Sequence, residues 1–241
     1  MREPRGYVLY EGPSELDGRP IVAVLTLRSK NEKTGPMAQL WILCADVAPL
    51  DALRSGADSA ICGDCPLRGD HGHGRSCYVQ VGQAPAAVWE AWRRGIYPVH
   101  LHPARAGAGR RIRLGAYGDP AAVPAHILRA LVSRADTHTG YTHMWDRADI
   151  ADFVMASVHS AQGAATARAR GYRVFWSGPE DGSPPAGERL QWCPATPERG
   201  YRLTCATCRA CEGSAPWSRR TADVFIRAHG AGKKYLRVLS A

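Results

Sequence analysis

The sequence predicts an α/β protein, built as a complete or partial parallel β/α barrel with cysteine-rich metal-binding loops. From Arg111 onward, segments of strand length alternate with segments of helical periodicity, which is the pattern of parallel strands joined by right-handed crossovers. Eight cysteines fall into two sets of four, and four thiolates at short spacings can hold a zinc ion or an iron–sulfur cluster. A doubly wound open sheet is the alternative to the barrel.

The chain of 241 residues is 45% hydrophobic, which is enough for one large domain or two small ones. We expect a single barrel-like domain over residues 1–241. Residues 1–20 are polar and rich in glycine and proline, which predicts an N-terminal arm or a loosely attached hairpin. The cysteines define a first loop over residues 44–77 and a C-terminal loop over residues 193–211.

Short apolar runs in the first half of the chain predict two strands, over residues 21–27 and 38–44. Residues 47–53 can form one or two helical turns. A longer helix is expected over residues 83–94, because a proline lies near its start and apolar side chains share one face.

The second half of the chain has a regular rhythm of strands and helices. The expected strands cover residues 111–117, 139–145, 153–158, 172–176 and 224–230, and the expected helices cover residues 121–134 and 160–170. Because helices separate successive strands, we expect the strands to pair in parallel. Their carboxyl ends then meet at one edge, where the active sites of β/α barrels lie.

The second cysteine set is the strongest chemical signal in the chain. Cys193 is followed after 11 intervening residues by Cys205, and two C-x2-C steps lead on to Cys208 and Cys211. Three thiolates on one tight loop and a fourth from the end of a strand can close around one metal centre. A proline directly after Cys193 is typical of bacterial ferredoxin loops, which favours a [4Fe–4S] cluster, with zinc as the alternative.

The first set is spaced less regularly. Its members are Cys44, Cys62, Cys65 and Cys77. Cys62 and Cys65 form a two-ligand knuckle, and His71 or His73 could replace either outer cysteine. This loop is too rich in Gly, Asp and His to pack a core, so a metal would supply its ordering energy. Structural zinc and a catalytic cluster both suit the spacing.

The turn that follows the strand over residues 111–117 reads GAYGDP and carries candidate cofactor and catalytic residues. Gly115 and Gly118 let a ligand approach the backbone, and Asp119 could bind an amine or act as a base. Asp119 is also a good N-cap and Pro120 a good first helical residue, so capping alone could explain both.

Further candidates lie on the next two expected strands. Tyr141 and His143 alternate along one strand and therefore share a face. Ser157 and His159 end the following strand in the same way. Together with Asp119 these side chains could line one pocket, with the tyrosine and the histidines as catalytic residues and the serine as a cofactor contact.

A histidine–hydrophobic–histidine motif occurs at His100 and His102. On a strand, such a pair could hold a divalent metal for a tyrosine-dependent nickase, with Tyr141 or Tyr235 as the nucleophile. This motif therefore predicts a nicking DNA-binding protein as a further alternative.

The formal charge of +9, from 31 basic and 22 acidic residues, favours a polyanionic partner, so we expect a nucleic acid or nucleobase substrate. An arginine-rich coding bias would give the same balance. No apolar run approaches the length of a membrane span, and the first residues lack an apolar signal segment. We therefore expect no membrane association and a cytoplasmic location, whereas the sequence does not predict the oligomeric state.

In the order of its motifs, the chain resembles the phage-associated "gene product 88"-like proteins over about residues 35–230. The matching motifs are CGDC…SCYV, GAYGDPAAVP, TGYTHMW, VMASVHS and CPAT…CATCRACEG. This resemblance implies a phage setting and brings no settled activity with it.

The same order of motifs is similar to a divergent radical S-adenosylmethionine barrel. That resemblance implies that Cys62, Cys65 and Cys77 hold a [4Fe–4S] cluster which reduces S-adenosylmethionine. It also implies that residues 118–120 contact the methionine amine and that the second cysteine set holds an auxiliary cluster. The spacing here is C-x2-C-x11-C, where radical enzymes usually have C-x3-C-x2-C.

A looser resemblance links the chain to the tRNA- and DNA-guanine transglycosylases, which are β/α barrels with a cysteine-rich zinc site. It implies that Asp119 is a nucleophile and that the second cysteine set binds zinc. Our leading hypothesis is a metal-cluster enzyme, similar to the radical enzymes, that acts on nucleic acid or a nucleobase. The zinc-stabilised transglycosylase and a non-enzymatic or nicking DNA-binding replication protein are the alternatives.

Overall fold

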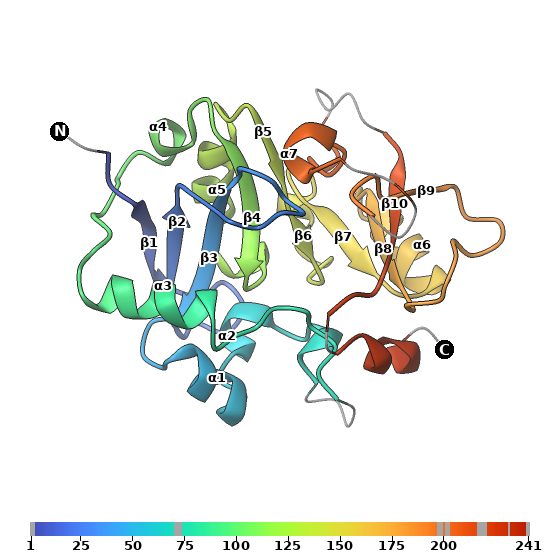
Figure 1. Ribbon diagram of the computed structural model, residues 1–241, viewed down its shortest axis with the longest axis horizontal. Coiled ribbons are helices and arrows are strands. Elements are labelled where there is room, and N and C mark those ends of the chain that lie inside the picture. The colour runs from blue at the N-terminus through green and yellow to red at the C-terminus, as the bar shows by residue number, and fades with distance from the viewer. Residues whose placement is uncertain are drawn as a thin grey trace. The chain divides into compact units, whose positions relative to one another are not determined.

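A computed structural model describes most of the chain, namely residues 3–69, 74–196, 200, 203–215, 221–230 and 232–239. The protein has a mixed α/β fold, and its strands form two five-stranded sheets (Figure 1). The residues divide into two compact units. Unit 1 comprises Met1–Gly63 and Gln80–His138, and unit 2 comprises Asp64–Val79 and Thr139–Ala241.

The first sheet lies in unit 1 apart from Thr139, the last residue of its fifth strand. In their spatial order its strands are β1 (Gly6–Pro13), β2 (Pro20–Thr26), β3 (Ala38–Cys44), β4 (Arg111–Tyr117) and β5 (Thr137–Thr139). The pairs β1–β2 and β2–β3 are antiparallel, and β3–β4 is parallel. The central strands are buried along almost their whole length, which is why their sequences are continuous apolar runs.

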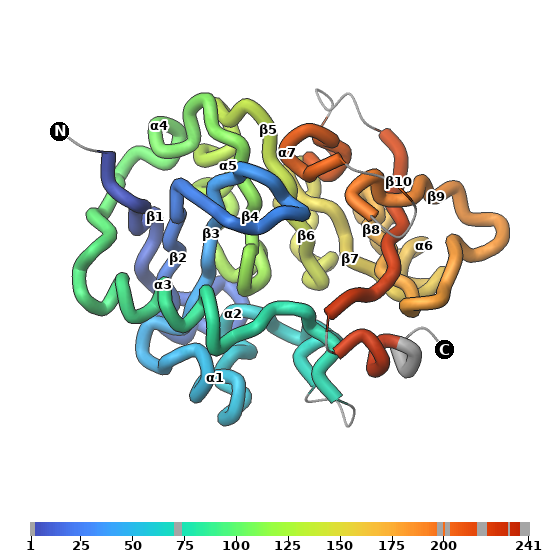
Figure 2. Tube along the Cα trace, viewed as in Figure 1, coloured from blue at the N-terminus to red at the C-terminus, as the bar shows by residue number. Residues whose placement is uncertain are grey.

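Short helices cover this sheet. Those that contact β3 are α1 (Pro49–Ser55), α2 (Ser59–Cys62) and α3 (Ala84–Arg93), while α4 (Pro103–Gly107) packs on α5 (Ala125–Val132). Between α3 and α4 the chain runs along the outer edge of β1 (Figure 2). There the N–H of Val8 donates to the Pro98 carbonyl at 3.0 Å, and the N–H of His100 donates to the Val8 carbonyl at 2.9 Å.

The second sheet lies in unit 2, and its neighbouring strands pair in parallel. In spatial order they are β6 (Tyr141–Thr142), β7 (Met155–Val158), β8 (Val174–Gly178), β10 (Asp223–Arg227) and β9 (Leu190–Trp192). Helix α6 (Ala161–Ala169) joins β7 to β8 and contacts both. Among the described residues, this unit also contains the helical segments η1 (Pro66–Arg68), η3 (Ala148–Ile150), α7 (Cys205–Cys208) and η5 (Lys233–Leu239).

The predicted α/β class is confirmed, and the strands predicted over residues 38–44 and 111–117 coincide with β3 and β4. The helix predicted over residues 121–134 is shorter, because Pro124 separates the 3₁₀ turn η2 (Pro120–Ala122) from α5.

The strand predicted over residues 139–145 contains only two residues in β6. It ends where the Thr142 hydroxyl accepts the N–H of Met144 at 2.9 Å, a local bond that competes with strand pairing.

The expected N-terminal arm contains β1, whose side chains Val8 and Leu9 are buried, so this segment is part of the first sheet. Within the described part of the chain, no helix combines the length and the apolar character that a membrane span requires.

Gly118 offers a test of how the turn after β4 packs against β3. Its φ is +79°, and a Cβ at this position would lie 2.7 Å from the Cβ of Ile42. We expect Gly118→Ala to lower the free energy of unfolding by about 2–4 kcal/mol, because it adds backbone strain and steric overlap. Urea denaturation measures this loss. Gly95→Ala is the control, because Gly95 has φ +70° with no atom within 4 Å of an added Cβ, and we expect about 1 kcal/mol there. Equal losses would contradict the packing role of Gly118.

Candidate functional site

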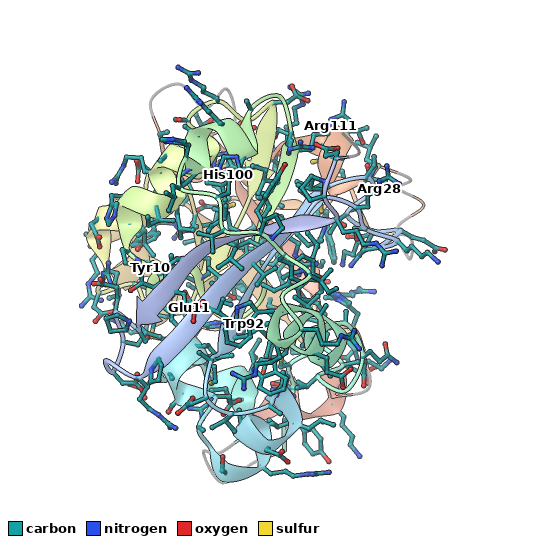
Figure 3. The ribbon with its side chains drawn as sticks, turned by 90° about the vertical axis from the view of Figure 1, so that its left-hand side faces the viewer. Tyr10, Glu11, Arg28, Trp92, His100 and Arg111 are labelled. Atoms are coloured by element: carbon teal, nitrogen blue, oxygen red, sulfur yellow. The ribbon has the colours of Figure 1, made fainter. Side chains whose placement is uncertain are left out.

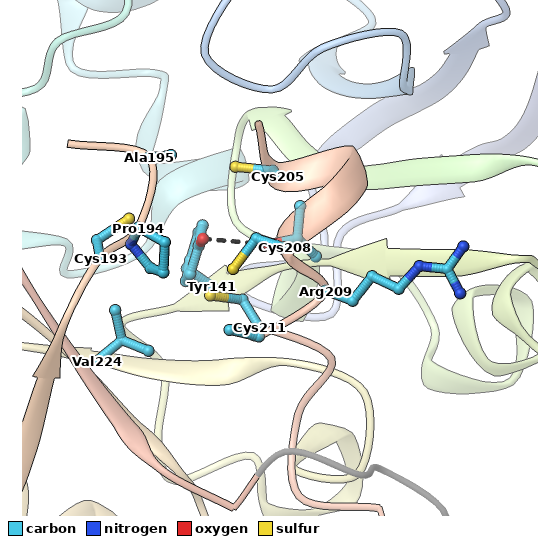
Figure 4. A pocket seen from close by; sticks show the side chains of 11 residues that line it. Tyr141, Cys193, Pro194, Ala195, Cys205, Cys208, Arg209, Cys211 and Val224 are labelled. Carbon is cyan, nitrogen blue, oxygen red and sulfur yellow. Dashed lines mark hydrogen bonds between the residues drawn. The ribbon is translucent and has the colours of Figure 1, made fainter. Parts of the chain in front are cut away.

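A pocket in unit 2 gathers the second cysteine set (Figure 4). It holds about 330 Å³ of unfilled space, counted out to its open mouth. The side chains around it include Thr139, Tyr141, Cys193, Pro194, Ala195, Cys205, Cys208, Arg209, Cys211 and Val224. Thiols that are separated in sequence therefore converge on one small space.

Cys193 and Cys211 are anchored to the parallel sheet. Cys193 directly follows β9, as the sequence predicted, and its N–H donates to the Phe225 carbonyl of β10 at 2.8 Å. The carbonyl of Cys211 accepts the N–H of Gly140, just before β6, at 3.4 Å. Both cysteine side chains are buried in the apolar cluster beneath the pocket.

The other two thiols of this set open and close α7 (Cys205–Cys208), a single helical turn. Thr204 caps the start of this turn, and its side chain and that of Thr207 form a reciprocal capping box. The turn ends at Arg209, whose φ of 58° is left-handed and redirects the chain toward the sheet. Local capping therefore presents this C-x2-C step at the pocket.

The electrostatics of the pocket favour neutral thiols in the absence of a cation. Burial has the largest effect and raises the pKa of the Cys211 thiol, whereas its hydrogen bond to Tyr141 acts in the opposite direction. The neighbouring Cys193, Cys205 and Cys208 raise the pKa further, because ionised sulfurs would repel one another. A cation among them would reverse this balance and stabilise the thiolates.

Tyr141 lies in the same pocket and is committed to hydrogen bonds. Its hydroxyl accepts the Thr139 hydroxyl at 3.1 Å and is hydrogen-bonded to the sulfur of Cys211. Burial, followed by the neighbouring thiols, raises the pKa of Tyr141 well above its usual value, so the phenol is neutral. A neutral phenol that donates to a sulfur suits the support of a metal ligand. The predicted catalytic role of Tyr141 stays a prediction.

The chemistry of the second set fits a metal, although the side chains do not converge at single-ion spacing. Four thiols are a complete donor set for tetrahedral zinc or for a [4Fe–4S] cluster. Among the described residues, no three histidine, cysteine or carboxylate side chains are spaced as the ligands of one metal ion. To hold one metal ion, the thiols would therefore have to move closer together.

The first cysteine set is divided between the units. Cys44 and Cys62 belong to unit 1, and Cys65 and Cys77 belong to unit 2. The thiol of Cys44 donates to the Ala57 carbonyl at 3.4 Å, and burial raises the pKa of Cys44 to about 12, which indicates a protonated core thiol. The alternative ligands His71 and His73 lie outside the described residues.

The carboxyl ends of β6, β7 and β8 carry a chain of hydrogen bonds. His143 follows β6 and His159 follows β7, and their Nε2 atoms are 3.0 Å apart. The Sγ atom of Cys65 lies 3.3 Å from Nδ1 of His143. Nδ1 of His159 lies 3.0 Å from the carbonyl oxygen of Ser177 in β8. The parallel register of these strands brings the residues side by side.

The protonation of this chain follows from its partners. Burial, assisted by His159, holds the pKa of His143 well below its usual value, and burial also lowers the pKa of His159. Both rings are therefore neutral, with one N–H each. Because the carbonyl of Ser177 can only accept, the proton of His159 is on Nδ1 and its Nε2 is an acceptor. His143 then donates from Nε2 and accepts from Cys65 at Nδ1.

Ser157, a predicted cofactor contact, is buried in β7. Its carbonyl accepts the indole N–H of Trp145 at 3.0 Å. Ser157 belongs to unit 2 with His143 and His159, whereas Asp119 belongs to unit 1. The single pocket expected to unite them stays a prediction.

The GAYGDP turn is packed tightly within unit 1. Asp119 accepts the N–H of Ala121 at 2.9 Å, which confirms its capping role, and Pro120 begins η2. Gly115 and Gly118 have φ of +63° and +79°, and a Cβ on the first would lie 2.7 Å from the carbonyl oxygen of the second. The turn geometry therefore accounts for both glycines. The predicted cofactor and catalytic roles of these four residues stay predictions.

The histidine–hydrophobic–histidine motif lies outside the named strands, so it lacks the strand conformation on which its proposed metal binding depends. Val99 makes only an isolated bridge to Val8. The N–H of His102 donates to Nδ1 of His100 at 3.2 Å, which uses that nitrogen in a local turn. The two tyrosines considered as its nucleophile belong to unit 2, whereas these histidines belong to unit 1.

The sequence analysis missed Arg173 and the pairing of Cys65 with His143. Arg173 is 9% exposed, and its guanidinium donates to the carbonyls of Ala210 at 2.9 Å and Gly213 at 3.0 Å. A charged residue at the start of the apolar run YRVFW was a signal for such a buried anchor. The thiol–imidazole pair joins residues 78 positions apart and had no local signal.

Comparison with protein-family models, with curated proteins and with solved structures finds no match to this chain. The resemblances to the phage family, the radical enzymes and the transglycosylases therefore stay predictions.

The buried thiol of Cys44 makes stability sensitive to alkaline pH. Its pKa is about 12 in the folded protein against a usual 9.0, so the unfolded chain loses this proton first as the pH rises. We expect no effect of this group below about pH 9 and a loss of up to about 1.4 kcal/mol per pH unit between about pH 9 and 12. Urea denaturation across this range should show a shallower fall for Cys44→Ala than for the wild type. Parallel curves would contradict the burial of this thiol.

Proposed function

We propose that unit 2 binds a thiolate-ligated metal centre through Cys193, Cys205, Cys208 and Cys211. We further propose that the protein is a metal-dependent enzyme acting on nucleic acid or a nucleobase. The observation that supports the metal centre is the convergence of these four thiols on one pocket. Ionised neighbours repel one another there, and a metal cation offsets this repulsion, so thiolate formation and metal binding are linked.

A [4Fe–4S] cluster is the proposed centre, and zinc is the alternative. The spacing of the C-x2-C steps and the proline that follows Cys193 support the cluster. When bound, a cluster would supply electron transfer, whereas zinc would order the loop. The radical version of the proposal adds S-adenosylmethionine as a cofactor and a barrel arrangement of the strands.

The chain's own residues would support the centre from outside its ligand set. The phenol of Tyr141 donates to Cys211, which stabilises the thiolate form of that ligand. Arg173 holds the backbone around Cys211 through the carbonyls of Ala210 and Gly213. The pocket is thereby attached to the parallel sheet on the side of Cys211 and, through the Phe225 carbonyl, on the side of Cys193.

Metal analysis tests this proposal directly. Protein purified without oxygen should be brown and contain about four iron atoms per chain for the cluster, or be colourless with about one zinc per chain for the alternative. Cys208→Ser should lose most of the bound metal, because it removes one of four ligands. Cys44→Ala is the control and should retain the metal, since that thiol bonds to a core carbonyl. Metal-free wild type, or full metal content in Cys208→Ser, would contradict the proposal.

The proposed nucleic-acid partner is supported by charge and by partly exposed aromatic rings beside an arginine. The chain carries a formal charge of +9. In unit 1, the guanidinium of Arg93 lies over the rings of Trp89 and Trp92, 5.7 Å from each centroid. Figure 3 shows Trp92 on the same side of this unit as His100 and Arg111. Basic groups interleaved with aromatic rings suit the backbone and the bases of a single strand.

The salt dependence of DNA binding tests whether nucleic acid is the partner. We expect affinity for a single-stranded DNA oligonucleotide to fall as NaCl rises, because bound counterions are released on association. Arg93→Ala should weaken binding several-fold and reduce the slope of log affinity against log salt by about 1. Arg170→Ala removes the same charge from an exposed position at the end of α6 and should have little effect. Fluorescence anisotropy gives both values, and failure to bind at low salt would contradict the proposal.

A further inference from the structure

We propose that Cys65, His143 and His159 form a nucleophilic relay, in which Cys65 attacks an electrophilic acyl carbon and forms a thioester. This activity goes beyond the metal centre proposed at the second cysteine set, and it excludes the radical version, in which Cys65 would be a cluster ligand. It also gives Cys65 a different role from the metal-ligand role that its C-x2-C spacing predicted.

The direction of the hydrogen bonds carries the proposal. The carbonyl of Ser177 holds the proton of His159 on Nδ1, which leaves Nε2 of that ring to accept from His143. His143 therefore presents an unprotonated Nδ1 to the Cys65 thiol, 3.3 Å away. The site of an activated cysteine nucleophile consists of a thiol, a base beside it and a third group that orients the base.

The packing of the two rings holds the base in place. Their centroids are 5.3 Å apart at an interplanar angle of 21°, so the rings lie end to end and nearly parallel, as the hydrogen bond between their Nε2 atoms requires. His159 is 7% exposed, which limits movement of the orienting ring. Cys65 is only partly buried, at the start of η1, and its carbonyl accepts the N–H of Arg68 at 3.2 Å. The thiol and the base are thus both partly exposed, beside a buried orienting ring, which is the arrangement that a substrate needs.

The reaction balances with the groups present. As Sγ bonds to the acyl carbon, the thiol proton moves to Nδ1 of His143, and the π electrons of the carbonyl move to its oxygen. These electrons then return and expel the leaving group with its bonding pair, and the leaving group takes the proton from His143. A water molecule hydrolyses the thioester with the same base and restores the thiol. The N–H of His143 stays bonded to His159 throughout and stabilises the imidazolium.

Iodoacetamide tests the thiol in the native protein. The sulfur bonds to the methylene carbon, iodide departs, and the thiol proton passes to His143. Cys77 is the internal control, because it lies in the same segment, is also partly buried and has no hydrogen bond to a histidine among the described residues. We expect Cys65 to be modified at least tenfold faster than Cys77, as measured by peptide mass spectrometry. Equal rates in the wild type would overturn the proposal without any variant.

Two variants separate the base from the residue that orients it. His143→Gln should slow modification of Cys65 at least tenfold and leave Cys77 unchanged, which also shows that the segment is folded. His159→Asn should shift the pH profile of Cys65 modification and leave that of Cys77 in place, as a positioning role requires. An unchanged Cys65 rate in His143→Gln would overturn the relay.

The proposed acyl chemistry has its own readout. Incubation with p-nitrophenyl acetate should release p-nitrophenol and leave an acetyl group on Cys65, detected on its peptide by mass spectrometry. Cys65→Ala should lose that release, while its metal content should match the wild type. If Cys65 is instead protected from both reagents and a chelator exposes it, the residue is a metal ligand and the relay is wrong. Loss of metal in Cys208→Ser tests the metal centre and neither supports nor contradicts the relay.

Discussion

The buried guanidinium of Arg173 is the contact on which the chemistry of unit 2 depends. It donates to the carbonyls of Ala210, Gly213 and Ala222. Arg173 directly precedes β8, so this one side chain connects β8 both to the backbone around Cys211 and to the residue that precedes β10. Burial lowers the pKa of Arg173, and the nearby Cys211 and Asp223 oppose that effect. A buried cation is costly unless it is hydrogen-bonded. The two terminal nitrogens of Arg173 donate to these carbonyls, whereas Nε has no partner among the described residues. If the loop around Cys211 left the sheet, a guanidinium that stayed buried would lose these acceptors, and this cost favours the observed form of the pocket.

The parallel sheet of unit 2 then determines where reactive groups can gather. Strands β6, β7, β8 and β9 are each followed, at or near their carboxyl ends, by a group that the proposals use. These groups are His143, His159, the Ser177 carbonyl and Cys193. Because neighbouring strands run in the same direction, side chains distant in sequence meet at one edge without a dedicated scaffold. The same constraint therefore underlies both the proposed metal pocket and the proposed relay.

The sequence was most informative where local pattern decides structure. The apolar runs that became β3 and β4, and the cap at Asp119, depend on neighbouring residues only, and each was predictable. The short length of β6 was not predictable, because the strand ends where the Thr142 hydroxyl accepts the N–H of Met144. The cysteine spacing predicted two metal-binding sets, and the four thiols of the second set line one pocket; metal binding there stays a prediction. Spacing could not show that Cys44 bonds to a core carbonyl or that Cys65 meets a histidine, since both contacts depend on how the chain folds back.

Three cysteines of this chain show how far the neighbour, rather than the residue type, decides the chemistry of a thiol. Cys44 faces a carbonyl in the core, where burial keeps it protonated and inert. Cys211 faces other thiols and a phenol, where ionisation is favourable only if a cation compensates. Cys65 faces the unprotonated nitrogen of an imidazole, which can take its proton at the moment of reaction. A count of eight cysteines suggests a protein with two metal sites, whereas these surroundings place Cys44 in a core and support two different proposals, a metal pocket at the second set and a nucleophile at Cys65.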